Sequence, residues 1–253
     1  MSPLGIASIV FVCIFGSAMF GFYLRTVLPD HHLSDDSMRV VTLSTALIAT
    51  LAAVVLGLLI SSAKSSFDSI SDEITQTASR VVLLDRSLAN FGPETKETRD
   101  LLHRAFASAI EMIFAKESSG LAKLTALERL AGMEQFQAKL RELAPRNDAQ
   151  RSLQSRALEL SNELLQMRWL VIAHERDAIL PPFLAVLVVW LSIIFVGFGV
   201  HTANNAIVLT TLFVCALSVS GAIFLIEELD HPLEGLMQVS SAPLRNALTQ
   251  LGQ

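Results

Sequence analysis

The sequence predicts an all-α polytopic membrane protein with four transmembrane helices and a helical cytoplasmic bundle between the second and third of them. Of its 253 residues, 52% are hydrophobic and only 17% are charged, whereas about a quarter are charged in an ordinary soluble domain. The apolar residues are gathered into four long blocks. The polar segment between the second and third blocks repeats its apolar residues with a helical period.

The first two apolar blocks are Pro3–Leu24 and Val40–Ala63, and neither contains a charged residue. Crossing a bilayer as a helix takes about 20 apolar residues, so both blocks are long enough. No basic residue precedes the first block, which is also longer than the apolar part of a signal peptide. We therefore expect a retained span, with Tyr23 and Arg25 at its interfacial end.

The other two blocks lie within residues 179–226, a stretch without Asp, Glu, Lys or Arg. His201 and the Asn204–Asn205 pair interrupt this stretch, which divides it into spans of about 181–200 and 206–226. The alternation typical of transmembrane β-strands is absent. We therefore expect all four spans to be helices, which satisfy every backbone hydrogen bond within the segment that crosses the lipid.

The basic residues indicate the orientation of the spans. The 19 lysines and arginines lie between Lys64 and Arg176, apart from Arg25, Arg39 and Arg245. Because basic residues near span ends favour the cytoplasmic side, we expect the middle segment and both termini to be cytoplasmic. The net charge of −5 offers no electrostatic basis for nucleic-acid binding, and two cysteines exclude a disulfide scaffold.

Residues 64–180 are expected to form a four-helix cytoplasmic bundle. The second span should continue as one helix to about Asn90, because apolar residues recur every seven positions after it. These residues are Phe67, Ile74, Val81 and Leu88. Further helices are expected at about 94–117, 121–143 and 148–179. Their apolar stripes fit either the core of the bundle or packing between subunits.

The predicted division of the chain has four parts. Residues 1–63 hold the first two spans, 64–180 the cytoplasmic bundle, and 181–227 the last two spans. Residues 228–253 form an acidic segment and a short amphipathic tail helix at about 240–251.

No motif of a known enzyme is present, whether nucleophile elbow, zinc signature, P-loop or dinucleotide fingerprint. In the loop between the first two spans (residues 25–39), which we expect to face the outside, His31–His32 with Asp35 and Asp36 could bind a divalent ion. A solvated loop is the simpler interpretation, in which Ser34 or Asp36 caps a helix that starts near Met38. We therefore expect no enzymatic activity.

The second span carries a narrow face of small side chains. The spans lack charged residues, which argues against ion-coupled transport. A passive pore can be lined by small and hydroxyl side chains, and close helix packing uses the same residues. The face and its edges consist of Thr42, Thr45, Ala46, Ala49, Thr50, Ala53, Gly57 and Ser61. Small residues of the first and fourth spans, Ser17, Gly21, Cys215, Ser218 and Gly221, are expected to serve packing.

Carboxylates cluster directly after the fourth span, at Glu227, Glu228, Asp230 and Glu234. Clustered oxygen ligands could bind Ca²⁺, and the first three are the candidate ligands. The alternative is a charged stop at the membrane boundary.

Short motifs stand in a fixed order along the chain: Leu56–Ile60, Leu84–Leu88, Phe91–Pro93, Pro181–Leu184, Trp190–Leu191, Asn204–Asn205, Glu228–Pro232 and Ser240–Leu244. In this order they resemble a family of bacterial four-span membrane proteins called bestrophin-like. The family is distantly similar to bestrophins, which are pentameric, calcium-regulated anion channels with a pore lined by the second span. The resemblance implies a homo-oligomeric ion channel of the bacterial inner membrane.

The chain also departs from the bestrophin pattern. Bestrophin pores carry aromatic constrictions on the second span, which has no aromatic residue here. Near the outer mouth, Asp30, Asp35 and Asp36 outnumber Arg25 and Arg39, so this region would not concentrate anions. Selectivity between anions and monovalent cations stays open. The alternative function is a non-conducting membrane scaffold whose cytoplasmic bundle binds a partner helix.

Overall fold

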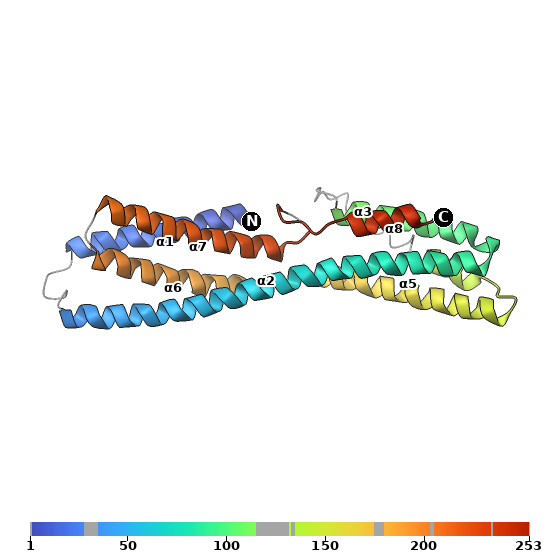
Figure 1. Ribbon diagram of the computed structural model, residues 1–253, viewed down its shortest axis with the longest axis horizontal. Helices are drawn as coiled ribbons and strands as arrows, with labels where there is room; N and C mark the ends of the chain where they lie inside the picture. Colours follow the sequence, from blue (N-terminus) through green and yellow to red (C-terminus); the bar gives the residue numbers. More distant parts are fainter. Residues whose placement is uncertain are drawn as a thin grey trace. The chain divides into compact units, whose positions relative to one another are not determined.

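The computed structural model is helical throughout most of the residues that it describes. It describes residues 2–27, 35–114, 132, 135–174, 180–202, 205–233 and 235–252, and no strand occurs in these ranges. The helices are α1 (Pro3–Val27), α2 (Asp35–Phe91), the 3₁₀ turn η2 (Pro93–Thr95), α3 (Lys96–Phe114), α5 (Asp148–His174), α6 (Leu180–His201), α7 (Ala206–Asp230) and α8 (Ala242–Gln250) (Figure 1).

Four of the described helices are long and apolar enough to cross a membrane. These segments are Pro3–Val27, Arg39–Phe91, Pro182–His201 and Ala206–Asp230. Together with the helical remainder, they confirm the prediction of an all-α polytopic membrane protein.

Helix α2 is continuous from the second span into the polar segment, as the heptad pattern predicted. It begins at Asp35, earlier than the predicted start near Met38, so Asp36 lies inside its first turn and is not the N-cap. Ser34 and the His31–His32 pair lie outside the described residues.

Other helix boundaries agree with the positions of proline in the sequence. Pro181 and Pro182 lie in the first turn of α6, where a missing backbone N–H costs no intrahelical hydrogen bond. Helix α5 is described as far as His174. Most of the predicted helix at 121–143 lies outside the described residues.

The chain forms two compact units. The first, here called the membrane unit, comprises Met1–Phe67, Ala178–His231 and Gly235–Met237. The second, the polar unit, comprises Asp68–Asp177, Pro232–Glu234 and Gln238–Gln253. Helix α2 contributes residues to both, and each unit is described by itself.

In the membrane unit, α1 packs against α6 and α7. Its contact with α6 is a close crossing at Gly21 and Gly199. A Cβ added at Gly21 would lie 3.0 Å from Gly199 Cα, and one added at Gly199 would lie 2.9 Å from the Phe22 amide nitrogen. Ala18 is fully buried at the same crossing. Small residues allow this approach of two backbones, so the packing role predicted for Gly21 is observed.

The contact between α1 and α7 is aromatic. The rings of Phe11 and Phe15 are stacked with centroids 5.8 Å apart, and each meets Phe213 edge-on at 5.4 and 5.6 Å. Edge-to-face pairs of this kind contribute beyond the area that they bury.

The polar unit has its own apolar core. The heptad residues of α2 from Ile74 onward, including Val81 and Leu88, are buried. Leu102 and Phe106 of α3 are buried as well, and so are apolar residues of α5 such as Leu160. The stripes therefore form the core of this chain, which was one of the two interpretations that the sequence allowed.

An ion pair lies within the polar unit between α2 and α3. The Arg99 guanidinium donates from Nε to Asp85 Oδ1 and from Nη2 to Oδ2, both at 2.7 Å. The amide nitrogen of Gly252 also donates to Asp85 Oδ2 at 3.3 Å. Asp85 is buried, and its hydrogen bonds raise the pKa of Arg99 above the ordinary value. One carboxylate thus joins α2, α3 and the end of the tail.

Replacing Gly21 by valine should destabilise the crossing of α1 and α6. The new side chain would meet backbone atoms of α6, which cannot move aside, and overpacking of this kind costs about 3 kcal/mol. Thermal unfolding of the detergent-solubilised protein measures the effect. Gly221→Val is the matched control, because no atom lies within 4 Å of a Cβ at Gly221. Equal melting temperatures for the two variants would contradict the close crossing.

Asp85→Asn should lower the stability of the polar unit by about 2 kcal/mol, because it removes the buried carboxylate that pairs with the half-buried Arg99 guanidinium. Thermal unfolding again provides the readout. The control is Glu159→Gln, which removes the same charge from the exposed pair Arg156–Glu159 and should change stability by less than about 0.5 kcal/mol. Similar losses in both variants would argue against a special role of Asp85.

Candidate functional site

Within the membrane unit, α2 presents faces of different character, because successive residues are rotated by about 100° around the helix. Ala52, Leu59 and Ala63 form a buried face. A second face exposes large apolar side chains, as expected of a surface in contact with lipid. Its members are Leu43, Leu47, Leu51, Val54 and Leu58.

The small residues singled out in the sequence lie between these two faces. Six of the eight predicted pore-lining residues are exposed in this chain, and Thr45 and Ala49 are half-buried. Apart from the helix's own backbone, no atom of the described residues lies within 4 Å of a Cβ placed at Gly57. The exposed members are Thr42, Ala46, Thr50, Ala53, Gly57 and Ser61, here called the small face. Packing within this chain therefore does not account for them.

The small face presents oxygen atoms but no ionisable group along its length. The Thr50 hydroxyl donates to the Ala46 carbonyl oxygen at 3.0 Å, which leaves its own oxygen as an acceptor. Arg39 and Lys64, both exposed, fall on the same side of α2 at the two ends of this face. Such a surface can contact hydrated ions without taking up protons.

A hydrogen bond joins the N-terminal end of the small face to α6. Thr42 Oγ1 lies 3.1 Å from His201 Nε2, and His201 Nδ1 lies 2.7 Å from the Gly197 carbonyl oxygen. Because a carbonyl only accepts, Nδ1 carries the proton, and Nε2 of a neutral ring accepts from the Thr42 hydroxyl. A Cβ at Gly197 would lie 3.2 Å from Thr45 Oγ1, so α2 and α6 approach closely here.

The role of His201 was not predicted, since the sequence indicated only that it interrupts an apolar stretch. No sequence signal could have identified it, because every residue within a helix has a carbonyl four positions earlier and the partner Thr42 lies far away in the chain.

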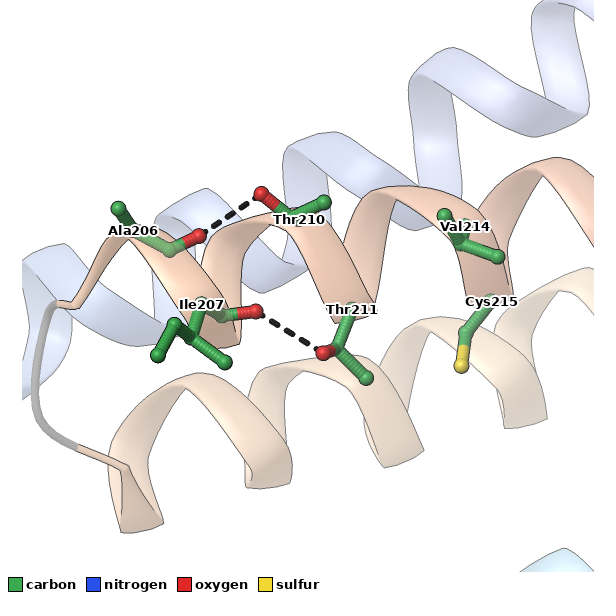
Figure 2. A pocket seen from close by; sticks show the side chains of 6 residues that line it. All are labelled: Ala206, Ile207, Thr210, Thr211, Val214 and Cys215. Atoms are coloured by element: carbon green, nitrogen blue, oxygen red, sulfur yellow. Dashed lines mark hydrogen bonds between the residues drawn. The ribbon is translucent and has the colours of Figure 1, made fainter.

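A shallow hollow of about 490 Å³ lies on α7 (Figure 2). All six lining residues come from this one helix: Ala206, Ile207, Thr210, Thr211, Val214 and Cys215. The Thr210 and Thr211 hydroxyls donate to the carbonyl oxygens of Ala206 and Ile207, both at 2.9 Å. With its donors satisfied, the hollow is an open apolar surface. Cys215, Ser218 and Gly221 are exposed, so the packing predicted for them does not occur within this chain.

The acidic residues after the fourth span have different surroundings. Glu227 and Glu228 are buried in the last turns of α7, and Asp230 is half-buried. Glu228 Oε2 accepts hydrogen bonds from the amides of Leu236 at 2.7 Å and Met237 at 3.3 Å. Glu234 lies outside the described residues.

Calcium takes six to eight oxygen ligands, and this segment does not supply them alone. In the described part of the chain, no three His, Cys, Asp or Glu side chains gather into a group that could hold a metal ion. Glu228 is engaged with two backbone amides. Calcium binding by Glu227, Glu228 and Asp230 stays a prediction.

The fold and these faces define a four-span helical membrane protein with an exposed small-residue face on its second span. The bestrophin-like domain model matches residues 12–244, and the chain belongs to the bestrophin-like family. This membership suggests an ion channel at the level of the family. Comparisons with curated proteins and with solved structures found no match.

Thr42→Val should weaken the attachment of α2 to α6 at no cost in side-chain volume. The lost hydrogen bond should lower the free energy of unfolding by about 1 kcal/mol, measured by thermal unfolding in detergent. Thr50→Val is the control, because its hydroxyl bonds only to its own helix. An equal effect of both substitutions would remove the case for an inter-helix bond.

Proposed function

We propose that the protein is an oligomeric ion channel that conducts passively through a pore lined by α2. The observation that carries the proposal is the exposed small face. Apart from Thr42, which is hydrogen-bonded to His201 of α6, its members are not covered by any described part of this chain. Copies arranged around an axis would turn these faces toward one another. Small and hydroxyl side chains would then leave an open path for hydrated ions.

The assembly that we propose is a homo-oligomer, and a pentamer by the resemblance to bestrophins. Its partners are the lipid bilayer and inorganic ions. We place it in the bacterial inner membrane, with both termini and the polar unit in the cytoplasm, as the basic residues near the span ends favour. We propose no enzymatic activity.

The charges at the ends of the small face favour neither anions nor monovalent cations as the conducted species. In a ring of subunits, Arg39 and Lys64 would each be repeated around the axis, and so would Asp35 and Asp36, which precede Arg39 by about one turn of α2. The reversal potential in a salt gradient across a planar bilayer distinguishes the two. A value near the chloride potential assigns anion conduction, and a value near the potassium potential assigns cation conduction.

Cysteine accessibility can identify the pore-lining face. In a Cys13→Ser, Cys215→Ser background, a charged water-soluble thiol reagent should reduce the current of Ala53→Cys. The same reagent should leave Val54→Cys unaffected, because that adjacent residue lies on the large apolar face. Current through purified protein in planar bilayers is the measurement. A block of Val54→Cys but not Ala53→Cys would reject the small face as the lining.

The absence of any conductance at all pH values, calcium concentrations and salt gradients would overturn the channel proposal itself. A monomer or dimer without current would favour the scaffold alternative. The burial of Ile74, Val81 and Leu88 within the polar unit weighs against that alternative, because these residues are not exposed for a partner helix.

A further inference from the structure

A short turn after the fourth span exposes two large apolar side chains. The turn consists of Gly235, Leu236 and Met237 and is here called the apolar turn. Leu236 is 80% exposed and Met237 is 45% exposed. Two adjacent exposed apolar side chains are not a large patch in themselves, but next to the end of a membrane span they can contact lipid or another protein.

The backbone of the apolar turn is held by a buried carboxylate. Glu228, only 3% exposed, accepts through Oε2 from the amides of both Leu236 and Met237. Hydrogen bonds to an ionised carboxylate are among the strong ones. With both amides turned toward Glu228, the side chains of Leu236 and Met237 remain exposed. The turn therefore presents its apolar side chains from a fixed backbone.

Gly235 is required for this arrangement. Its φ of +98° lies in the region that favours glycine, and a Cβ at this position would overlap Glu228 Oε2. A residue with a side chain would be strained at this φ, and either the turn or the Glu228 carboxylate would have to shift.

The apolar turn lies beside the end of a membrane span. Glu228 belongs to the last turns of α7, and Gly235–Met237 belong to the membrane unit. Leu225, one turn earlier on α7, is 50% exposed and continues the lipid-facing surface of that helix. The turn is thus adjacent to the end of a candidate span, where a bilayer crossed by α7 would pass from hydrocarbon to headgroups.

We propose that the apolar turn inserts Leu236 and Met237 into the bilayer at the boundary of headgroups and acyl chains, and that Glu228 is its positioning residue. The partner is the acyl-chain region, because the exposed side chains of the turn are apolar. Of the titratable groups nearby, Glu227 and Asp230 are acidic and would not attract lipid phosphate, and His231 interacts with these two carboxylates. Contact should therefore occur in uncharged phosphatidylcholine, since apolar area drives it.

The test uses the full chain in phosphatidylcholine liposomes. Leu236→Cys, in the Cys13→Ser, Cys215→Ser background, is labelled with an environment-sensitive fluorophore. Lipids with a nitroxide on the upper acyl chain should quench this label, and aqueous iodide should quench it several-fold less than a label at Gln238→Cys. Gln238 is an exposed polar residue directly after the turn and serves as the matched control.

Variants of Glu228 and Gly235 test whether the backbone of the apolar turn must be held in place for Leu236 to reach the lipid. Glu228→Ala removes both hydrogen bonds, and Gly235→Ala strains the backbone of the turn and disturbs its contact with the Glu228 carboxylate, so either should raise iodide quenching at position 236. Glu228→Gln retains an acceptor oxygen and should preserve lipid quenching. If Glu228→Ala does not fold, Gly235→Ala still provides the comparison.

Two results would overturn the proposal. Iodide quenching at 236 equal to that at 238 would place the turn in water. Protection from both iodide and lipid quenchers would mean that protein covers it, a second copy of the chain included. The assay needs no current, so its outcome is independent of whether the protein conducts.

Discussion

The close crossing of α1 and α6 at Gly21 and Gly199 is the constraint on which the membrane unit depends. Because neither residue has a side chain, the two backbones come into direct contact. Helix α6 in turn contacts α2 through Gly197 and His201. This contact involves Thr42 and Thr45, at the N-terminal end of the small-residue region of α2. From Ala46 to Ser61 the small face stays exposed, so the contact with α6 leaves most of the candidate pore surface uncovered.

Helix α2 has one pattern of side chains in the membrane span and another in the polar unit. In the span its packed face is narrow, and its other surfaces carry either large apolar or small side chains. In the polar unit a seven-residue repeat buries one stripe, while charged residues such as Asp72 and Arg86 face outward. The same helical geometry thus serves a lipid-exposed helix and a water-exposed bundle, and the side chains alone mark the change.

The architecture was largely predictable, because spans and heptads are local patterns that need no knowledge of distant contacts. Helix α2 could be followed from the sequence to Phe91 for this reason. The site was less predictable. The hydrogen bond between Thr42 and His201 joins residues far apart in the chain, and no local sequence pattern predicts it. The role of Glu228 was also missed, since a carboxylate that binds backbone amides looks the same in sequence as one that binds a metal.

The heptad stripe of α2 makes the polar unit sensitive to the length of this helix. Ile74, Val81 and Leu88 are buried at intervals of seven residues, and no glycine or proline lies between them. Inserting or deleting one residue between Ile74 and Val81 would rotate the buried residues on the two sides of the change by about 100° against each other, whereas a change of seven residues would nearly restore their alignment. Length changes within this part of α2 are therefore expected to be tolerated mainly in heptads.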